Sequence, residues 1–214
     1  MIEIKNLIKN YDNTSIKYND YKIEKGDFVS IIGPSGSGKS TLIDLIGNFI
    51  TYSSGHIYIF DKEISQFRKK EKNILIKRLG IMSSNSLLLS DLSVIENIKL
   101  PQLIHKNQIE ERHMSYLINK LNIENLLLKY PMSLSTGQRQ RVLLARAMIL
   151  KPDILIADEP TSNLDSENTN NLIKCLVNLN DELKTTIIVA THDKVVSNAS
   201  KRIFQLRWII VLSS

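Results

Sequence analysis

Three of the eight glycines of this chain lie within six residues, in the segment Gly33-Pro34-Ser35-Gly36-Ser37-Gly38-Lys39-Ser40. The segment matches the pattern G-x-x-x-x-G-K-[ST] in full, and it lies between the apolar run 28–32 and a helix predicted from Lys39 to about Ile50. Glycine lets the backbone curl until several N–H groups converge on phosphate oxygens, and the start of the following helix adds partial positive charge. This segment, called the phosphate loop below, therefore predicts a nucleotide site. Lys39 is expected to reach the β- and γ-phosphates, and the Ser40 hydroxyl is placed to bind Mg²⁺.

Apolar segments separated by helices dominate the last third of the chain. The segments 154–157 and 186–190 are nearly continuous apolar strands, and a helix is predicted between them from about Glu167 to Leu179. Such strands are typical of a parallel sheet that is covered on both faces. The first 30 residues instead show short strand-like runs separated by turns, and residues from about 86 to 150 are predicted to be mostly helical. The pattern predicts an α/β fold.

Length and composition favour one domain that lies outside the membrane. The chain has 214 residues, of which 43% are hydrophobic and 23% are charged, and both shares are near the averages of globular proteins. No apolar run approaches the roughly 20 residues that span a bilayer. Residues 1–12 mix charged with apolar side chains and lack the apolar region of a signal peptide. The single cysteine, Cys175, fits a reducing compartment, so we expect a cytoplasmic protein.

The net charge of +6, from 28 basic and 22 acidic residues, permits contact with nucleic acid or an anionic membrane but requires neither. The basic residues are spread along the chain. Their densest cluster, residues 68–72, is interrupted by Glu71, so it predicts a solvated helix face more than a binding patch.

Two further strand ends carry polar side chains that suit a nucleotide site. The strand 154–157 is followed by Asp158 and Glu159, and the strand 186–190 is followed by Thr191 and His192. Because ligands of open α/β sheets gather at the carboxyl ends of strands, these side chains should face the same crevice as Lys39. Asp158 is the expected partner of the metal, Glu159 is placed to orient the attacking water, and His192 could contact the γ-phosphate.

The other histidines have no metal-ligand spacing and no acidic partners nearby, so they are expected at the surface: His56, His105 and His113.

The segment Leu134-Ser135-Thr136-Gly137-Gln138, the signature loop below, distinguishes this chain among proteins with a phosphate loop. With it, the chain resembles the ATP-binding subunit of an ATP-binding-cassette (ABC) transporter, whose signature usually reads LSGGQ. The resemblance covers nearly the whole chain in order: the phosphate loop, the signature loop, the acidic strand, the segment 162–165 and His192. A helix start at Ser135 favours an anion through its free N–H groups and its dipole.

The resemblance implies one ABC ATPase domain over residues 1–214, with a phosphate-loop NTPase core, a mainly parallel sheet, an N-terminal antiparallel β-subdomain and an inserted α-helical subdomain over about 85–150. The catalytic residues it implies are Glu159, His192 and Lys39. The ATP-binding residues it implies are Tyr11, Gly33, Pro34, Ser35, Gly36, Ser37, Gly38, Lys39, Ser40, Thr41, Ser135, Gly137, Gln138 and Asp165. The Mg²⁺ ligands it implies are Ser40, Asp158 and Ser84.

In the family, the signature loop binds the γ-phosphate of ATP that is held by the opposite subunit, so that two chains enclose two nucleotides head to tail. A dimer is therefore implied, with two identical chains expected and two different chains as the alternative. The segments 91–98 and 157–165 look closest to the branch that serves lipoprotein release, macrolide export and antimicrobial-peptide export.

Two positions depart from the family pattern. Ser84 stands where the family has a glutamine that contacts Mg²⁺ and couples the site to the membrane partner. Thr136 stands where the signature usually has glycine, and a β-branched residue would be costly there if the position needed a positive φ. These departures leave the rate of hydrolysis and the coupling open.

We expect a cytoplasmic ATPase subunit, peripheral on the cell membrane, that uses ATP and Mg²⁺ to drive a separate transmembrane permease. The apolar residues Leu87, Leu88 and Leu89 are candidates for contact with that permease or for the core. Two alternatives remain: an ATP-binding regulatory module with weak hydrolysis, and a DNA-maintenance ATPase. No nucleic acid is expected, because those DNA-maintenance relatives carry a long coiled coil between phosphate loop and signature, whereas here only 96 residues separate Lys39 from Ser135.

Overall fold

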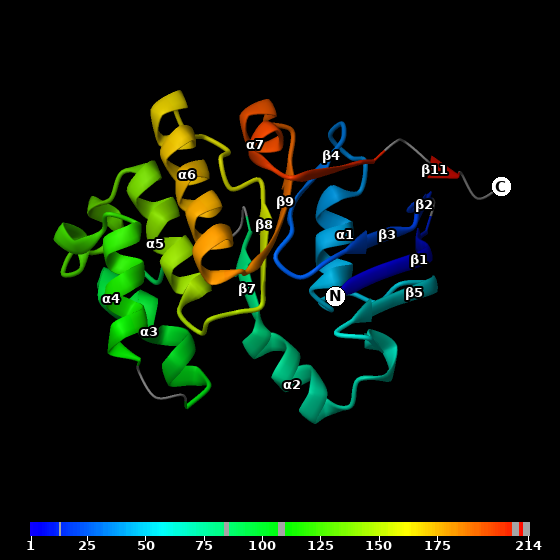
Figure 1. Cartoon of the computed structure of the whole chain (residues 1–214), viewed down its shortest axis with the longest axis horizontal. Helices are drawn as coiled ribbons and strands as arrows, with labels where there is room; N and C mark the ends of the chain where they lie inside the picture. Colours follow the sequence, from blue (N-terminus) through cyan, green and yellow to red (C-terminus); the bar gives the residue numbers. More distant parts are fainter. Residues whose placement is uncertain (13, 84–85, 107–109, 207–209, 212–214) are drawn as a thin grey trace.

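The structure, a computed structural model, describes residues 1–12, 14–83, 86–106, 110–206 and 210–211. Figure 1 shows two sheets beside a group of helices. The first sheet is antiparallel and has the order β11-β2-β1-β5-β6, with β3 also paired to β1. Its strands are β1 (Ile2–Tyr11), β2 (Thr14–Lys17), β3 (Tyr21–Ile23), β5 (Ser54–Ile59), β6 (Lys62–Glu63) and β11 (Ile210–Val211).

The second sheet is parallel throughout and has the order β10-β4-β9-β8-β7. Its strands are β4 (Phe28–Ile32), β7 (Leu79–Met82), β8 (Ile154–Asp158), β9 (Thr186–Thr191) and β10 (Arg202–Gln205). The edge strand β7 was not predicted, because its four residues form too short an apolar run to stand out in the sequence.

The helices lie on both faces of the parallel sheet (Figure 1). The α-helices are α1 (Lys39–Ile46), α2 (Lys69–Arg78), α3 (Val94–Ile104), α4 (Glu111–Lys120), α5 (Thr136–Met148), α6 (Ser166–Leu183) and α7 (Lys194–Ala199), and short 3-10 helices are η1 (Ile64–Gln66), η2 (Glu124–Leu126) and η3 (Pro131–Ser133). Helix α1 ends earlier than expected, because Gly47 caps it and Asn48 turns the chain at a φ of 57°. Helix α6 continues further than expected, to Leu183, with Lys184 as its C-cap.

Alternate residues of the parallel strands enter two separate cores, which is why these strands are apolar throughout. Ile188 of β9 faces the core shared with α1 and the antiparallel sheet. Its neighbours Ile187 and Val189 face the core shared with α3, α4, α5 and α6. Both faces of the sheet are therefore covered, and the predicted α/β fold with its N-terminal antiparallel part and its helical part is confirmed.

The region between the phosphate loop and the signature loop contains short helices. In the described part of 86–135, the longest is α3, with 11 residues, so this part contains no long coiled coil. Within the described ranges, none of the helices is both long and apolar enough to cross a bilayer.

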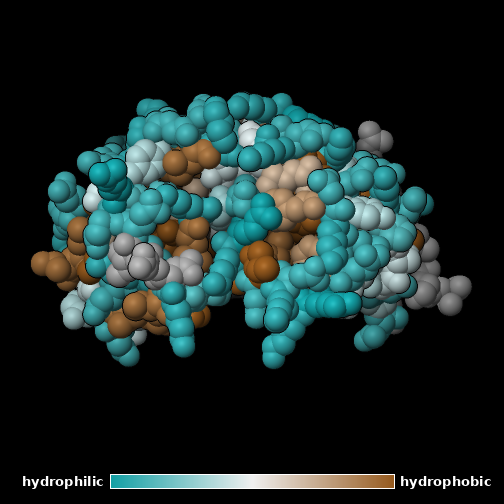
Figure 2. All heavy atoms as spheres, turned by 60° about the horizontal axis from the view of Figure 1, so that its bottom comes forward, coloured by the Kyte–Doolittle hydropathy of each residue, from teal (hydrophilic) through white to brown (hydrophobic). Residues whose placement is uncertain are grey.

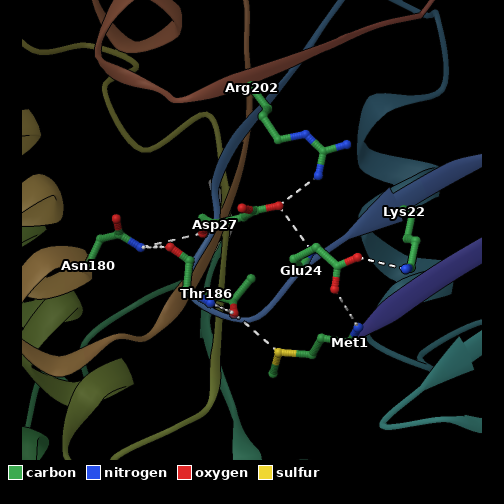
Figure 3. A network of polar contacts seen from close by, with 8 residues as sticks. Met1, Lys22, Glu24, Asp27, Asn180, Thr186 and Arg202 are labelled. Atoms are coloured by element: carbon green, nitrogen blue, oxygen red, sulfur yellow. Dashed lines mark hydrogen bonds and ion pairs between the residues drawn. The ribbon is translucent and has the colours of Figure 1, made fainter.

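Polar contacts join the end of β3, the last turns of α6 and the starts of β4, β9 and β10 (Figure 3). The Arg202 guanidinium donates to Asp27 Oδ2 at 2.7 Å, and the same carboxylate oxygen accepts the Glu24 N–H at 2.9 Å. Asn180 of α6 is 2% exposed, and its amide Nδ2 donates to Gly26 O at 2.9 Å and Thr185 O at 2.8 Å. One buried side chain thus supplies hydrogen-bond donors to carbonyl groups in the turns that precede β4 and β9.

Replacing Asn180 by Ala should lower the free energy of unfolding by about 2 kcal/mol, because it leaves buried carbonyl groups without a donor. Urea unfolding followed by circular dichroism measures this. Asn170→Ala, at an exposed position of the same helix, is the matched control and should change stability little. Equal unfolding midpoints for the two variants would show that the Asn180 contacts add nothing.

Candidate nucleotide site

The register of three neighbouring strands brings the expected catalytic segments to one edge of the parallel sheet. Ile32, at the end of β4, pairs with Thr191 at the end of β9, and Asp158 of β8 pairs with Ala190 of β9. The residues that follow are the phosphate loop, Glu159 and His192. They leave the sheet at the same level, as expected for a site at the carboxyl ends of parallel strands.

The phosphate loop is built around the Lys39 side chain. Lys39 is 8% exposed, and its ammonium Nζ donates to Gly33 O at 2.9 Å and to Pro34 O at 3.1 Å. An ammonium has three N–H donors, so one remains for a phosphate oxygen. Gly36 and Gly38 have φ values of 76° and 88°, which side chains with a Cβ rarely adopt, so the curl of the loop depends on glycine at both positions.

Asp158 lies beside the start of α1 and has an unused acceptor. Burial raises the pKa of the Asp158 carboxyl above its usual value, and the nearby Glu159 carboxylate adds to the rise, whereas a hydrogen bond from Ser40 and the charge of Lys39 oppose it. Its Oδ1 atom is buried without a hydrogen-bond partner. A buried carboxylate oxygen without a donor is costly, and a cation would satisfy it.

Glu159 and His192 contact each other directly. Glu159 Oε1 lies 3.0 Å from His192 Nδ1, and the Thr191 hydroxyl donates to Glu159 Oε2 at 3.5 Å. Glu159 has a φ of 48°, in the left-handed region, and its N–H donates to Ala190 O at 2.9 Å. Such a conformation costs a non-glycine residue on the order of 1 kcal/mol, and it turns the chain sharply at the end of β8. The His192 side chain is 72% exposed and is therefore accessible to a ligand.

The signature loop ends in a reciprocal cap at the start of α5. The Ser135 hydroxyl accepts the Gln138 N–H at 3.3 Å, and Gln138 Oε1 accepts the Ser135 N–H at 3.0 Å. This capping box was not predicted, although the spacing S-x-x-Q is its usual sequence signal. Thr136 is the first residue of α5 and is not among the residues with positive φ, so its β-branched side chain causes no left-handed strain.

The starts of α5 and α6 pack against each other. Asp165 caps α6 by accepting the Asn168 N–H at 2.8 Å, and its other oxygen accepts Asn168 Nδ2 at 2.8 Å. A Cβ added to Gly137 would lie 2.2 Å from Asn168 Oδ1, so Gly137 permits this close approach. Ser135, Gly137, Gln138 and Asp165 therefore form a second group. Among the described residues, no hydrogen bond joins this group to Lys39, Asp158, Glu159 or His192.

Tyr11 lies at the end of β1, beside the residue that follows the phosphate loop. The residue is 46% exposed, and its hydroxyl lies 3.3 Å from Thr41 Oγ1. An exposed aromatic ring beside the loop could stack on a base. Ser84 lies outside the described residues.

The expectations for two histidines are corrected, and the alternative left open for Leu88 is settled. His113 is 7% exposed, not at the surface; its Nε2 lies 2.9 Å from Met148 O, and burial lowers the pKa of the imidazole. His56 is exposed but has an acidic partner, with Nδ1 2.9 Å from Glu63 Oε1. Leu88 is 8% exposed and packs in the helical core, whereas Leu87 and Leu89 are exposed.

A parallel sheet with a phosphate loop after β4, an acidic pair after β8 and a histidine after β9 defines a phosphate-loop nucleoside triphosphatase. Within that class, the chain belongs to the ABC transporter family, because the sequence model of that family matches residues 16–162, more than half of the chain. It is accordingly an ATP-binding protein and an ATPase.

Relatives are similar along nearly the whole chain. The lipoprotein-releasing system ATP-binding protein LolD of Buchnera aphidicola is 36% identical over 96% of this chain and 94% of its own length. The macrolide export ATP-binding/permease protein MacB of Campylobacter jejuni is 39% identical over 97% of this chain, which corresponds to 33% of that longer protein. The expected branch of the family is confirmed.

Solved structures agree with the fold. The dimeric structure of MJ0796, a bacterial ABC transporter cassette, has a TM-score of 0.85 at 32% identity, over 96% of this chain and 94% of that chain. A post-hydrolysis state of MJ0796 bound to ADP and Pi has a TM-score of 0.85 at 31% identity, over 97% of this chain and 94% of that chain.

Gly137→Ala should lower the free energy of unfolding by about 1–2 kcal/mol, because the new Cβ overlaps Asn168 and disturbs its bonds to Asp165. Urea unfolding of a double-mutant cycle tests the stated cause. In an Asn168→Ala background the same change should cost about 0.5 kcal/mol or less. An equal cost in both backgrounds would mean that Gly137 is needed for a reason other than this contact.

Proposed function

We propose that this chain is the ATP-hydrolysing subunit of an ABC transporter, which drives a separate transmembrane permease by ATP-dependent dimerisation. One observation carries the proposal: the described part of the chain holds two groups of nucleotide-directed residues with no hydrogen bond between them. One group is the phosphate loop with Asp158, Glu159 and His192, and the other is the signature loop with Asp165. Two chains placed head to tail would bring the first group of each against the second group of the other.

The phosphate loop would hold the triphosphate of ATP. Backbone N–H groups of the phosphate loop, other than at Pro34, which has none, and at Ser37, which donates to Pro34 O, supply hydrogen-bond donors together with the start of α1. The buried Lys39 ammonium supplies a positive charge. The Tyr11 ring would stack on adenine, because it is exposed and its hydroxyl lies beside Thr41. The base would then contact the end of β1 in the antiparallel sheet, and the phosphates would contact the loop that follows β4 in the parallel sheet.

The residues of the first group fit Mg²⁺. Within the described ranges, no cluster of three or more His, Cys, Asp or Glu side chains could hold a metal by itself. Mg²⁺ commonly binds through one or two protein oxygens together with phosphate oxygens, and the partnerless Asp158 Oδ1 and the Ser40 hydroxyl suit this. When bound, the ion would neutralise charge on the phosphates. Ser84, the third expected ligand, lies outside the described residues.

Glu159 and His192 would act on the attacking water and the γ-phosphate. The Glu159 carboxylate can accept a hydrogen bond from water at the strand edge, and the contact with His192 orients it. His192 is exposed enough to donate to a γ-phosphate oxygen.

The signature loop would bind the γ-phosphate of the ATP held by the partner chain. The capping box uses the Ser135 and Gln138 N–H groups, which leaves the N–H groups of Thr136 and Gly137 free at the positive end of α5. Asp165 at the adjacent start of α6 would lie at the same interface. A homodimer is sufficient for this arrangement, because one chain carries both groups; a heterodimer with a related subunit would satisfy it equally.

The permease would dock on the face formed by α2, β7 and α3. Figure 2 shows apolar side chains exposed on the face that carries α2 and α3. A cavity of about 160 Å³ between these elements and α5 is lined in part by Ile76, Pro101 and Leu150, and Leu103 and Ile104 are 62% and 66% exposed nearby. Contact with an apolar segment of the permease would cover this surface and hold the chain at the cytoplasmic face of the membrane.

The similarity to LolD and MacB supports export of a peptide, a lipoprotein or a hydrophobic drug.

Glu159→Gln should reduce steady-state ATP turnover by about 100-fold or more while ATP binding is kept, because the amide cannot accept a proton from water. Phosphate release by the purified chain measures turnover. Glu111→Gln, at an exposed position in the first turn of α4, away from both groups, is the matched control and should keep wild-type turnover. Unchanged turnover in Glu159→Gln would refute the role of Glu159. A wild-type chain that binds ATP without turnover would favour the weak-hydrolysis regulatory module.

A further inference from the structure

A buried tyrosine of the N-terminal sheet bonds directly to the phosphate loop. Tyr18, which follows β2, is 2% exposed, and its hydroxyl donates to Gly38 O at 3.0 Å. Burial raises the pKa of the Tyr18 hydroxyl well above its usual value, so the group remains a proton donor. The backbone N–H of Tyr18 donates to Leu7 O at 2.9 Å, which fixes the residue to β1.

The accepting carbonyl belongs to the peptide that opens α1. Gly38 is the N-cap of this helix, and its carbonyl also accepts the Leu42 N–H at 2.9 Å. A trans peptide is planar, so the direction of the Gly38 C=O fixes the direction of the Lys39 N–H, which points the opposite way. That N–H is one of the free donors at the start of α1 and has no partner within the helix. The hydrogen bond from Tyr18 therefore fixes the direction of the Lys39 N–H, which is a donor for phosphate.

The side chains of Ile16 and Tyr18 also pack against Gly38 itself. A Cβ at Gly38 would lie 2.9 Å from Tyr18 Oη and 3.1 Å from Ile16 Cγ2. Gly38 has a φ of 88°. Because glycine adopts positive and negative φ about equally well, the backbone alone does not fix the orientation of the Gly38–Lys39 peptide, and an external contact is needed. The Tyr18 hydroxyl supplies that contact through its directed bond to the Gly38 carbonyl, and Ile16 packs beside it.

We propose that Tyr18 is a positioning residue for nucleotide binding: its hydroxyl holds the Gly38–Lys39 peptide so that the Lys39 N–H faces the nucleotide's polyphosphate. The inference rests on the proposed function, since it concerns the same phosphate loop. Tyr18 acts through the peptide and does not touch the nucleotide. It therefore changes the affinity for the polyphosphate of ATP and ADP and leaves the groups that act on the water in place.

The test compares Tyr18→Phe with Tyr21→Phe in the purified full chain. Each variant removes one hydroxyl that donates to a backbone carbonyl, but the carbonyl that the Tyr21 hydroxyl contacts, Gln205 O at 3.4 Å, belongs to β10 and not to the phosphate loop. Isothermal titration with ADP and Mg²⁺ should show about five- to tenfold weaker binding for Tyr18→Phe and wild-type binding for Tyr21→Phe. In steady-state hydrolysis of ATP, Tyr18→Phe should raise KM and leave kcat nearly unchanged.

Two further measurements distinguish a change in the orientation of the Gly38–Lys39 peptide from a general loss of packing around the phosphate loop. In ¹⁵N-labelled protein, the Lys39 amide resonance should shift in Tyr18→Phe and not in Tyr21→Phe. A third variant, Ile16→Val, trims the other side chain that packs on Gly38 and keeps the hydroxyl, so it should retain wild-type affinity for ADP.

Equal ADP affinity in the wild type, Tyr18→Phe and Tyr21→Phe would overturn this inference and leave the proposed function standing. An equal loss of affinity in Ile16→Val and Tyr18→Phe would also overturn it, because packing and not the hydroxyl would then set the loop. A wild-type chain that failed to bind ADP at all would overturn the proposed function, and this inference with it.

Discussion

The hydrogen-bonded register of β4, β9 and β8 is the constraint on which the rest of the site depends. It sets the phosphate loop, Glu159 and His192 at one level of one sheet edge. Burial on both faces holds the register, because a shift of one residue would exchange the side chains of the two cores. Glu159 and His192 can contact each other at 3.0 Å because the ends of β8 and β9 are fixed side by side.

A single chain nevertheless carries only halves of the proposed site. The signature loop lies at the start of α5, where the capping box and the packing of Gly137 on Asn168 hold two helix starts side by side. These contacts join the signature loop to Asp165, so both would move as one unit when a partner chain approaches. In the proposed dimer, the edge of the parallel sheet of one chain would face the helical part of the other.

The sequence predicted features that local patterns encode. The phosphate loop, the acidic pair after β8 and His192 were found from short motifs next to apolar runs, and the α/β fold followed from the order of those runs. Contacts between distant segments could not be found in this way. The bond from Tyr18 to Gly38, the packing of Gly137 on Asn168 and the burial of His113 against Met148 each depend on how the chain folds back, and a single residue carries no signal of its partner.

The central claim is that ATP joins two copies of this chain head to tail, and the mass in solution tests it most directly. Light scattering of Glu159→Gln with ATP and Mg²⁺ should give the mass of a dimer, because the variant binds ATP and hydrolyses it slowly. The same protein with ADP should give the mass of a monomer. A monomer in both conditions, with ATP shown to be bound, would contradict the homodimer and point to a different second subunit or to the permease as a necessary part of the assembly.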